Sequence, residues 1–335
     1  MTEAGTLSIL KMVGVIMRDL ALRILRTSIM TLSIALYFSS SWGAKYAGDF
    51  LYLGAGARPL SLGGAYVASG GDVLAGYYNP AGLSTLENSE TIFMHSETFG
   101  SLLNHDFLAY ARPAGGEDNR AAFAVSLYRL GGGGILVTAV DQTGRYRVIR
   151  EESHADYVGY FSYGRQFGNR LSGGLTAKLI YRDIVDESAF GLGVDLGGLY
   201  RLAEWANVGI NLQDIPSTLI SYTTGMKQRV NPTAKAGLIL TGARGDFDGA
   251  LIADVDTRFE GRDYAAQIST GPFSFDTHLG LEILFKEKLA ARVGSDIGNL
   301  TLGAGLQFSR FVVDVAMRDH SDLDNTFLVS FMMRF

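Results

Sequence analysis

Carboxylates and glycines at short spacings are the residues of this chain that could bind an ion or a phosphate. Asp254 and Asp256 lie two residues apart, so in a strand both point to one face, where they hold either a cation or water. The acidic residues of 319–325 have the density of a calcium loop but lack its central Gly and final Glu. The glycines 131–134 lack the Gly-Lys-Ser/Thr ending of a phosphate loop and predict a flexible connection. We therefore expect no metal and no cofactor.

Residue sets typical of catalysis are also missing from the sequence. The chain has no Cys, which excludes thiolate nucleophiles, thiolate metal sites and disulfide frameworks. It has no Gly-x-Ser-x-Gly nucleophile elbow. The five histidines show no metal-ligand spacing; they are residues 95, 105, 154, 278 and 320. We predict that the protein is not an enzyme.

The composition limits what the protein can be. Of 335 residues, 47% are hydrophobic and 19% are charged, below the roughly 25% of ordinary soluble domains. The formal net charge of -5 argues against a nucleic-acid partner, because such proteins usually carry a basic face. The chain must bury a large apolar surface or turn it toward lipid.

The N-terminus has the pattern of a secretory signal peptide. Three arginines precede a stretch, 27–44, that contains no charged residue and ends among small residues. This predicts a signal peptide over 1–43, cut after Gly43 or Ala44, with translation starting at Met1 or Met17. A membrane anchor is the alternative, although the apolar part is shorter than the roughly 20 residues of a spanning helix.

The rest of the chain alternates between strand-like segments and turn residues. After residue 44, no uncharged apolar stretch approaches 18 residues, so a helical membrane bundle is excluded. In 277–285 and 326–335, apolar residues alternate with mostly smaller or more polar ones, as on a two-faced strand. We expect fourteen strands, at 90–99, 104–112, 121–130, 156–166, 171–182, 189–201, 206–213, 232–241, 248–256, 275–285, 288–296, 299–308, 311–318 and 326–335.

Three features favour a membrane barrel over a soluble exported β-sandwich. The number of strands is even, as in bacterial single-chain barrels. Some connections, such as 298–299 and 309–310, are short, whereas 214–231 and 257–274 are long and polar. Outer-membrane barrels have short turns at one end of the barrel and long loops at the other. The chain ends on Phe335, which resembles the assembly signal of outer-membrane proteins.

The predicted fold is therefore all-β, a 14-stranded antiparallel transmembrane β-barrel over 90–335 with an N-terminal helical plug (hatch). It would lie in the outer membrane of a Gram-negative-type bacterium, in contact with outer-membrane lipid and with the barrel-assembly machinery.

The plug is predicted over 44–89, which is rich in glycine and contains a helix-compatible piece, 64–78. Asn79 precedes a proline and is therefore biased out of the helical region, so a sharp turn should follow this piece. Arg58 is expected to pair with a carboxylate on the barrel wall and hold the plug in place. The plug motif comprises Gly56, Arg58, Gly63, Gly64, Asn79, Pro80 and Gly82.

A polar cluster is expected inside the barrel. By the period-2 pattern, its members face one interior and neutralise one another without any catalysis. They are His278, Glu282, Arg292, Asp314 and Arg318.

The segment 54–68, followed by Asp72, Ala75 and 77–83, resembles the N-terminal signature of the PorV/PorQ family. That family is part of the wider FadL-like group of 14-stranded outer-membrane barrels. The resemblance implies that the Asn-Pro-Ala-Gly element belongs to a plug inside the lumen. Some members are components of the type IX secretion system, whereas FadL resembles a passive channel for long-chain fatty acids.

Two functions follow from this resemblance. The first is a non-catalytic accessory or shuttle role in type IX-like protein secretion, through contacts with a larger secretion-complex subunit or with exported proteins. The alternative is a FadL-like channel for uptake or export of long-chain fatty acids or other hydrophobic molecules. Connection 214–231 would contact the partner or the ligand through Ile215, Leu219, Ile220, Tyr222 and Met226.

Overall fold

The computed structural model describes residues 47–98, 102–116, 120–262, 265–320 and 324–335. The chain divides into two compact units, 1–42 and 43–335, and every described residue belongs to the second. The expected signal peptide, 1–43, lies outside the described residues. None of the described helices is long and apolar enough to cross a membrane.

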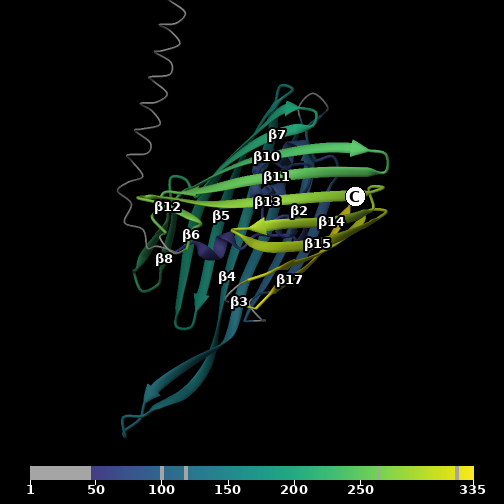
Figure 1. The fold of residues 1–335 in the computed structure, drawn as a ribbon. Helices are drawn as coiled ribbons and strands as arrows, with labels where there is room; N and C mark the ends of the chain where they lie inside the picture. The colour runs from purple at the N-terminus through teal and green to yellow at the C-terminus, as the bar shows by residue number, and fades with distance from the viewer. Residues whose placement is uncertain (1–46, 99–101, 117–119, 263–264, 321–323) are drawn as a thin grey trace, which may run out of the picture. The chain divides into compact units, whose positions relative to one another are not determined.

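Fourteen strands form a closed antiparallel barrel, in which each strand pairs with its neighbours around the ring (Figure 1). The ring closes where the first strand pairs with the last, from Glu90↔Arg334 to Glu97↔Phe327. Closure leaves no unpaired sheet edge around the ring. The strands are β1 (Glu90–Thr98), β2 (Leu103–Ala114), β3 (Ala121–Val140), β4 (Tyr146–Phe167), β5 (Leu171–Ile184), β6 (Glu187–Ala203), β7 (Ala206–Gln213), β10 (Thr233–Arg244), β11 (Phe247–Arg258), β13 (Phe273–Phe285), β14 (Leu289–Asp296), β15 (Asn299–Phe308), β16 (Phe311–Arg318) and β17 (Thr326–Arg334).

Three short strands lie in the two connections that we expected to be loops. β8 (Thr218–Tyr222) pairs with β6 and with β9 (Lys227–Val230). β12 (Ile268–Thr270) pairs with β13. The expectation of loops throughout 214–231 and 257–274 was therefore wrong, because these segments continue the hydrogen bonding of the barrel wall.

The glycines 131–134 are not a flexible connection, contrary to our expectation. β3 continues through them to Val140, and β4 begins at Tyr146, so the two strands form a long hairpin that projects from the barrel (Figure 1). The register shifts between Gly132 and Ile135. Four glycines have no side chains that could alternate, so the sequence shows no strand pattern here, although Gly131 and Gly132 pair with β4.

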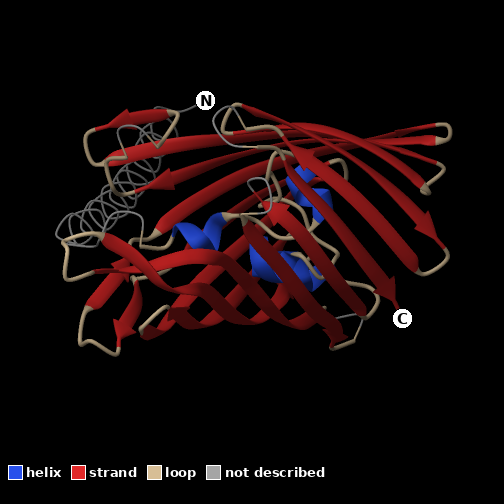
Figure 2. Cartoon of the chain, turned by 90° about the horizontal axis from the view of Figure 1, so that it is seen from below, coloured by secondary structure: helices blue, strands red, loops and turns tan. Residues whose placement is uncertain are grey.

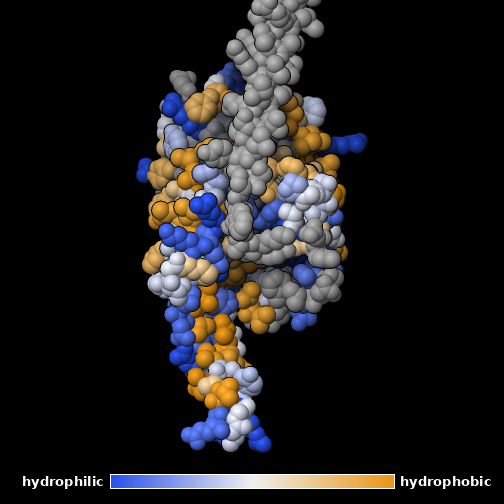
Figure 3. All heavy atoms as spheres, turned by 90° about the vertical axis from the view of Figure 1, so that its left-hand side faces the viewer, coloured by the Kyte–Doolittle hydropathy of each residue, from blue (hydrophilic) through white to orange (hydrophobic). Residues whose placement is uncertain are grey.

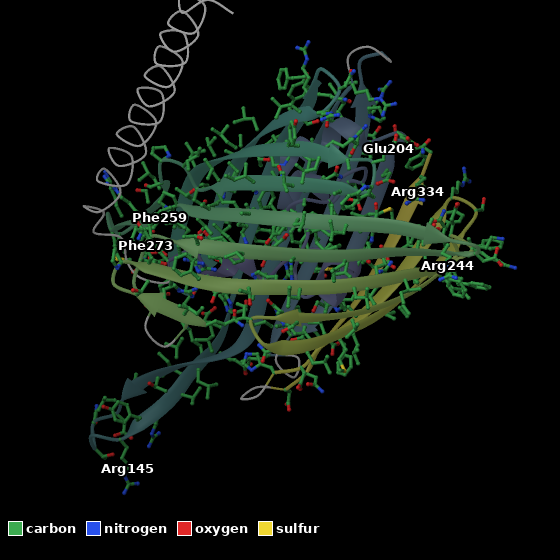
Figure 4. All side chains as sticks on the ribbon, turned by 45° about the horizontal axis from the view of Figure 1, so that its top comes forward. Arg145, Glu204, Arg244, Phe259, Phe273 and Arg334 are labelled. Atoms are coloured by element: carbon green, nitrogen blue, oxygen red, sulfur yellow. The ribbon has the colours of Figure 1, made fainter. Side chains whose placement is uncertain are left out.

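Both ends of the barrel chain lie at the same end of the barrel, where the Phe335 amide donates to the Ser89 carbonyl at 2.8 Å. Figure 4 shows Arg244 and Arg334 toward this end and Phe259 and Phe273 toward the other. Turn 309–310 lies at the terminal end, but turn 297–298 lies at the opposite end, with the long connections. The expected separation of short turns from long connections is therefore incomplete, because neighbouring antiparallel strands accept a two-residue turn at either end.

Side chains alternate between the inside and the outside of the barrel. On β13, Leu279, Leu281 and Ile283 are 41–51% exposed, whereas His278 and Glu282 are buried. The same alternation on the other strands leaves many large apolar side chains exposed, and orange patches mark them in Figure 3. An apolar outer surface of this extent favours a lipid environment.

The segment 47–89 contains four short helices: η1 (Asp49–Tyr52), α2 (Ala57–Ser61), α3 (Ala75–Tyr78) and η2 (Pro80–Thr85). Figure 2 shows helices surrounded by strands. Leu62, Tyr66 and Leu74 are almost completely buried and form part of the hydrophobic core. The expected helix over 64–78 is limited to α3, because Gly64 and Gly71 have positive φ angles that a helix cannot contain.

Candidate functional site

Arg58, on α2, connects segment 47–89 to the barrel wall. Its Nη2 and Nε donate to the two carboxylate oxygens of Glu282 at 2.8 and 3.0 Å, a bidentate pair. Its Nη1 lies 3.3 Å from Asp72 and 3.1 Å from the Tyr66 hydroxyl. The Arg58 side chain is 31% exposed, but the Glu282 side chain is only 2% exposed. The pair therefore satisfies a buried carboxylate of the wall.

Tyr66 extends this network within the segment. It is fully buried and donates its hydroxyl hydrogen to Asp72 Oδ2. Burial raises the pKa of Tyr66 well above its ordinary value, although the Arg58 guanidinium acts in the opposite direction. The Tyr66 hydroxyl therefore stays protonated and serves as a donor.

The five residues of the expected lumen cluster form two groups of ion pairs. In the first group, Arg292 joins Glu282 at 2.5 Å and Asp314 at 2.7 Å. In the second, Asp296 accepts from Arg318 at 2.9 Å and lies 3.0 Å from His278 Nδ1. The partners come from the neighbouring strands β13 and β14 and from β14 and β16, which flank β15. The positive and negative charges within each group largely balance one another.

Asn79 fixes the turn between α3 and η2. Its side-chain Oδ1 accepts from the Ala81 amide at 3.2 Å, the N-cap bond of η2, and Pro80 follows as the first helical residue. Its Nδ2 donates to the Val67 carbonyl at 2.7 Å and to the Gly198 carbonyl at 3.1 Å. One side chain thus connects two parts of the segment and the wall.

Glycines of the wall allow the segment to approach the strands closely. A Cβ atom added at Gly197 would lie 2.2 Å from Asn79 Oδ1, and one added at Gly174 would lie 2.3 Å from the Pro80 carbonyl carbon. At the opposite side, a Cβ at Gly303 would lie 2.3 Å from Ser61 Cβ. The two regions of contact are therefore shaped for the backbone of 61–63 and 79–81.

Of the other glycines of the predicted plug motif, Gly63 and Gly64 approach the wall, whereas a Cβ atom added at Gly56 or Gly82 would lie closest to atoms of segment 47–89. Gly56 precedes α2 with a φ of 82°. The Gly63 amide donates to Thr301 Oγ1 at 3.0 Å, and Gly64 lies beside His278. The Gly82 carbonyl accepts from the Gly71 amide at 3.1 Å.

Asp254 and Asp256 bind protein groups. Asp254 Oδ2 accepts from the Tyr66 and Val67 amides at 2.6 and 2.8 Å, and Asp256 pairs with Lys235. Within the described residues, no group of three or more His, Asp or Glu side chains could hold a metal ion. The acidic segment 319–325 lies partly outside these residues.

A cavity of about 270 Å³ opens at the barrel end that carries the long connections, and we call it the outer cavity. Its lining combines aromatic and aliphatic groups of segment 47–89 with charged groups of the wall. The lining includes Tyr52, Leu60, Tyr77, Tyr78 and Arg258.

Arg258 was not predicted from the sequence as a site residue, although it follows Asp256 by two residues in a strand and therefore shares its inner face. Its side chain is 9% exposed, and its guanidinium lies 4.3 Å from the centre of the Tyr52 ring. Its Nη1 lies 3.4 Å from Asp49, a side chain that is 45% exposed. Its Nε is buried and has no hydrogen-bond partner among the described residues.

A second cavity, of about 320 Å³, lies at the other end of the barrel, and buried parts of segment 47–89 lie between the two. Its lining is polar and includes Gln166, Asn169, Arg170 and Arg201.

The proposed contact residues of 214–231 do not share one surface. Leu219 and Met226 are 54% and 48% exposed, but Ile220 and Tyr222 are buried on the inner side. Ile215 is partly buried. The alternation of β8 separates residues that the sequence placed together.

No protein-family model and no curated protein sequence matches this chain. The structure of the chain does match solved structures. The Ralstonia pickettii toluene transporter TbuX is 13% identical, covers 85% of this chain and 99% of its own, and superposes with a TM-score of 0.57. The chain has the fold of these barrels. The Pseudomonas putida toluene transporter TodX is similar, with 13% identity, 84% and 98% coverage and a TM-score of 0.55. A Pseudomonas aeruginosa FadL homologue has 11% identity, the same coverages and a TM-score of 0.52.

Proposed function

We propose that this protein is a non-enzymatic, passive outer-membrane channel of the FadL-like type, which takes amphipathic molecules with an anionic head, such as long-chain fatty acids. Segment 47–89 acts as its plug, and the outer cavity is the entrance. The similar fold of two toluene transporters and a FadL homologue supports a transport role. The apolar outer face of the strands supports a place in the outer membrane of a Gram-negative bacterium.

The contacts of segment 47–89 support its role as a plug. It occupies the space between the two cavities, and Arg58, Asn79 and the amide of Gly63 connect it to strands on different sides of the barrel. A ligand that passes through must displace part of this segment or go around it.

The outer cavity carries the argument for the ligand. Tyr77, Tyr78 and Leu60 offer a surface for an apolar chain, and Arg258 offers a buried donor for a carboxylate. An incoming carboxylate can replace Asp49, whose side chain is nearly half exposed. A plain hydrocarbon leaves the Arg258 donor unsatisfied, which costs free energy.

Binding of two matched ligands tests this function. The purified barrel in a mild detergent should bind labelled dodecanoate more tightly than dodecanol, which has the same chain but no charge. Arg258→Gln should weaken dodecanoate binding about tenfold and leave dodecanol binding unchanged, because only a charged head uses the guanidinium. Arg145→Gln, at the exposed tip of the β3–β4 hairpin, is the matched control. Equal binding of the two ligands by the unmodified protein contradicts the proposed ligand class.

An accessory role in type IX-like secretion, resembling PorV/PorQ, is the second candidate. The projecting β3–β4 hairpin favours it, because a simple channel has no need of such a projection. Purification from outer membranes in mild detergent, followed by mass spectrometry, separates the two. Stoichiometric recovery of a large secretion subunit supports the accessory role, and recovery of the barrel alone with bound fatty acid supports the channel.

A further inference from the structure

The outer part of the β3–β4 hairpin is a two-stranded ribbon, residues 135–140 paired with 146–152. β2 pairs with β3 only as far as Gly131, and β5 pairs with β4 only from His154. Among the described strands, none pairs with the outer edges of the ribbon. Its backbone N–H and C=O groups on those edges are therefore available to another strand.

The two edges of the ribbon differ in charge. The β4 edge carries Arg147, Arg150, Glu151 and Glu152, and charges of this kind keep other strands away. The β3 edge has no charged residue and no proline from Leu130 to Val140. The β3 edge is therefore the edge that can accept an uncharged strand. A charged strand would meet no oppositely charged side chain on this edge.

One face of the ribbon is exposed and mostly apolar, and its charged member is Glu151 of β4, which pairs with Leu136. Val140 pairs with Tyr146, and Thr138 pairs with Val148, so these side chains share a face with Leu136. Leu136, Val140, Tyr146 and Val148 are 56–78% exposed. The projecting hairpin shows a stripe of apolar atoms in Figure 3.

Lipid is not the natural cover for this face. On the outside of the barrel, Asp106 joins His95 at 2.7 Å and Arg129 at 3.0 Å, and all three side chains are partly exposed. Charged groups on the outer face mark the polar boundary of the lipid layer. Leu136 follows Arg129 by seven residues, or roughly 20 Å along a strand, and therefore lies beyond that boundary.

We propose that the β3 edge of the ribbon binds an extended, uncharged, apolar segment of a second protein by strand addition. The partner strand continues the sheet through main-chain hydrogen bonds, and its apolar side chains cover Leu136 and Val140. Specificity comes from the absence of charge on this edge. The proposal is independent of the ligand in the outer cavity.

A peptide tests the proposal on the full-length barrel in detergent. The probe is a fluorescent peptide with the sequence of residues 134–140, which has the required chemistry, flanked by lysines for solubility. It should bind saturably, whereas a peptide with prolines at the third and fifth of these positions should not, because proline cannot pair. Thr138→Lys, at an exposed position of the edge, should weaken binding about tenfold. Gln142→Lys, at the exposed tip, adds the same charge and should leave binding unchanged.

Folding of each variant is checked by its heat-dependent mobility on a gel. Failure of the peptide to bind the folded protein, or equal binding to both lysine variants, overturns the proposal. The chain has no native Cys, so Tyr146→Cys carries a single polarity-sensitive dye. A response of this dye to lipopolysaccharide vesicles and not to the peptide identifies a lipid contact and also overturns the proposal. Disulfide-linked dimers of Thr138→Cys without peptide identify a second copy as the occupant, with the same consequence.

Discussion

Arg58 and Glu282, 224 positions apart in the sequence, form a bidentate ion pair between segment 47–89 and the barrel wall. Glu282 also accepts from Arg292, and Arg58 also reaches Asp72. The pair is thus the centre of a charge network that begins in the segment and ends on β16.

Removing the guanidinium should loosen the segment. Arg58→Met should lower the free energy of unfolding by about 1–3 kcal/mol, because Glu282 then keeps only Arg292 as a charged partner. Arg58→Lys should restore little, since an ammonium cannot make the bidentate contact. Denaturant unfolding in detergent measures the loss, and Arg145→Met is the control. If Arg58→Met raises ion conductance in planar bilayers without any loss of stability, the contact is a gate and not a support.

The glycines of the wall predict a steric effect that depends on position. Gly197→Ala should impair assembly or displace the segment, because its Cβ would lie 2.2 Å from Asn79 Oδ1. Gly242→Ala, in β10, meets no atom within 4 Å and should be tolerated. Heat-modifiable gel mobility and limited proteolysis compare the two. Similar behaviour of the two variants would mean that the segment does not rest against β6.

Asn79 predicts a difference between two conservative changes. Asn79→Asp keeps the acceptor for the Ala81 amide but loses both bonds donated by Nδ2. Asn79→Ala loses all three and should cost about 2–3 kcal/mol of stability, more than Asn79→Asp. Unfolding curves of both variants, with exposed Asn104→Ala as control, check the order. A cost for Asn79→Asp that exceeds the alanine cost would indicate that the buried charge dominates.

The tip of the β3–β4 hairpin should respond to acid. The Thr143 hydroxyl, together with the Arg145 and Thr143 amides and the Arg147 side chain, lowers the pKa of Asp141 below its ordinary value. A carboxyl with a lowered pKa in the folded state stabilises the turn at pH values above its ordinary pKa, and this stabilisation disappears as the pH falls through the lowered pKa. A spin label at Gln142→Cys should therefore gain mobility in that acidic range. Asp141→Asn should show the mobile spectrum at every pH.

The sequence alone determined the positions of the barrel strands. Period-2 alternation places side chains on two faces, and it predicted segments that coincide with all fourteen strands of the ring to within a few residues at most ends. The hairpin was the main exception, since 131–134 have no side chains to alternate. The short strands β8, β9 and β12 were not predicted, because strands of three to five residues within polar, turn-rich connections are too short to show a period-2 pattern.

Only the tertiary structure decided which inner side chains meet. Glu282 and Arg292 face each other because β13 and β14 are paired in one register, and a shift of β14 by one residue would turn Arg292 to the outer face. The contact of Arg58 with Glu282 and the unsatisfied Nε of Arg258 depend on how segment 47–89 folds within the ring of strands. Period-2 alternation predicts on which face of the sheet a side chain lies. Which side chains come within contact distance of one another is fixed only when the strands pair and the barrel closes.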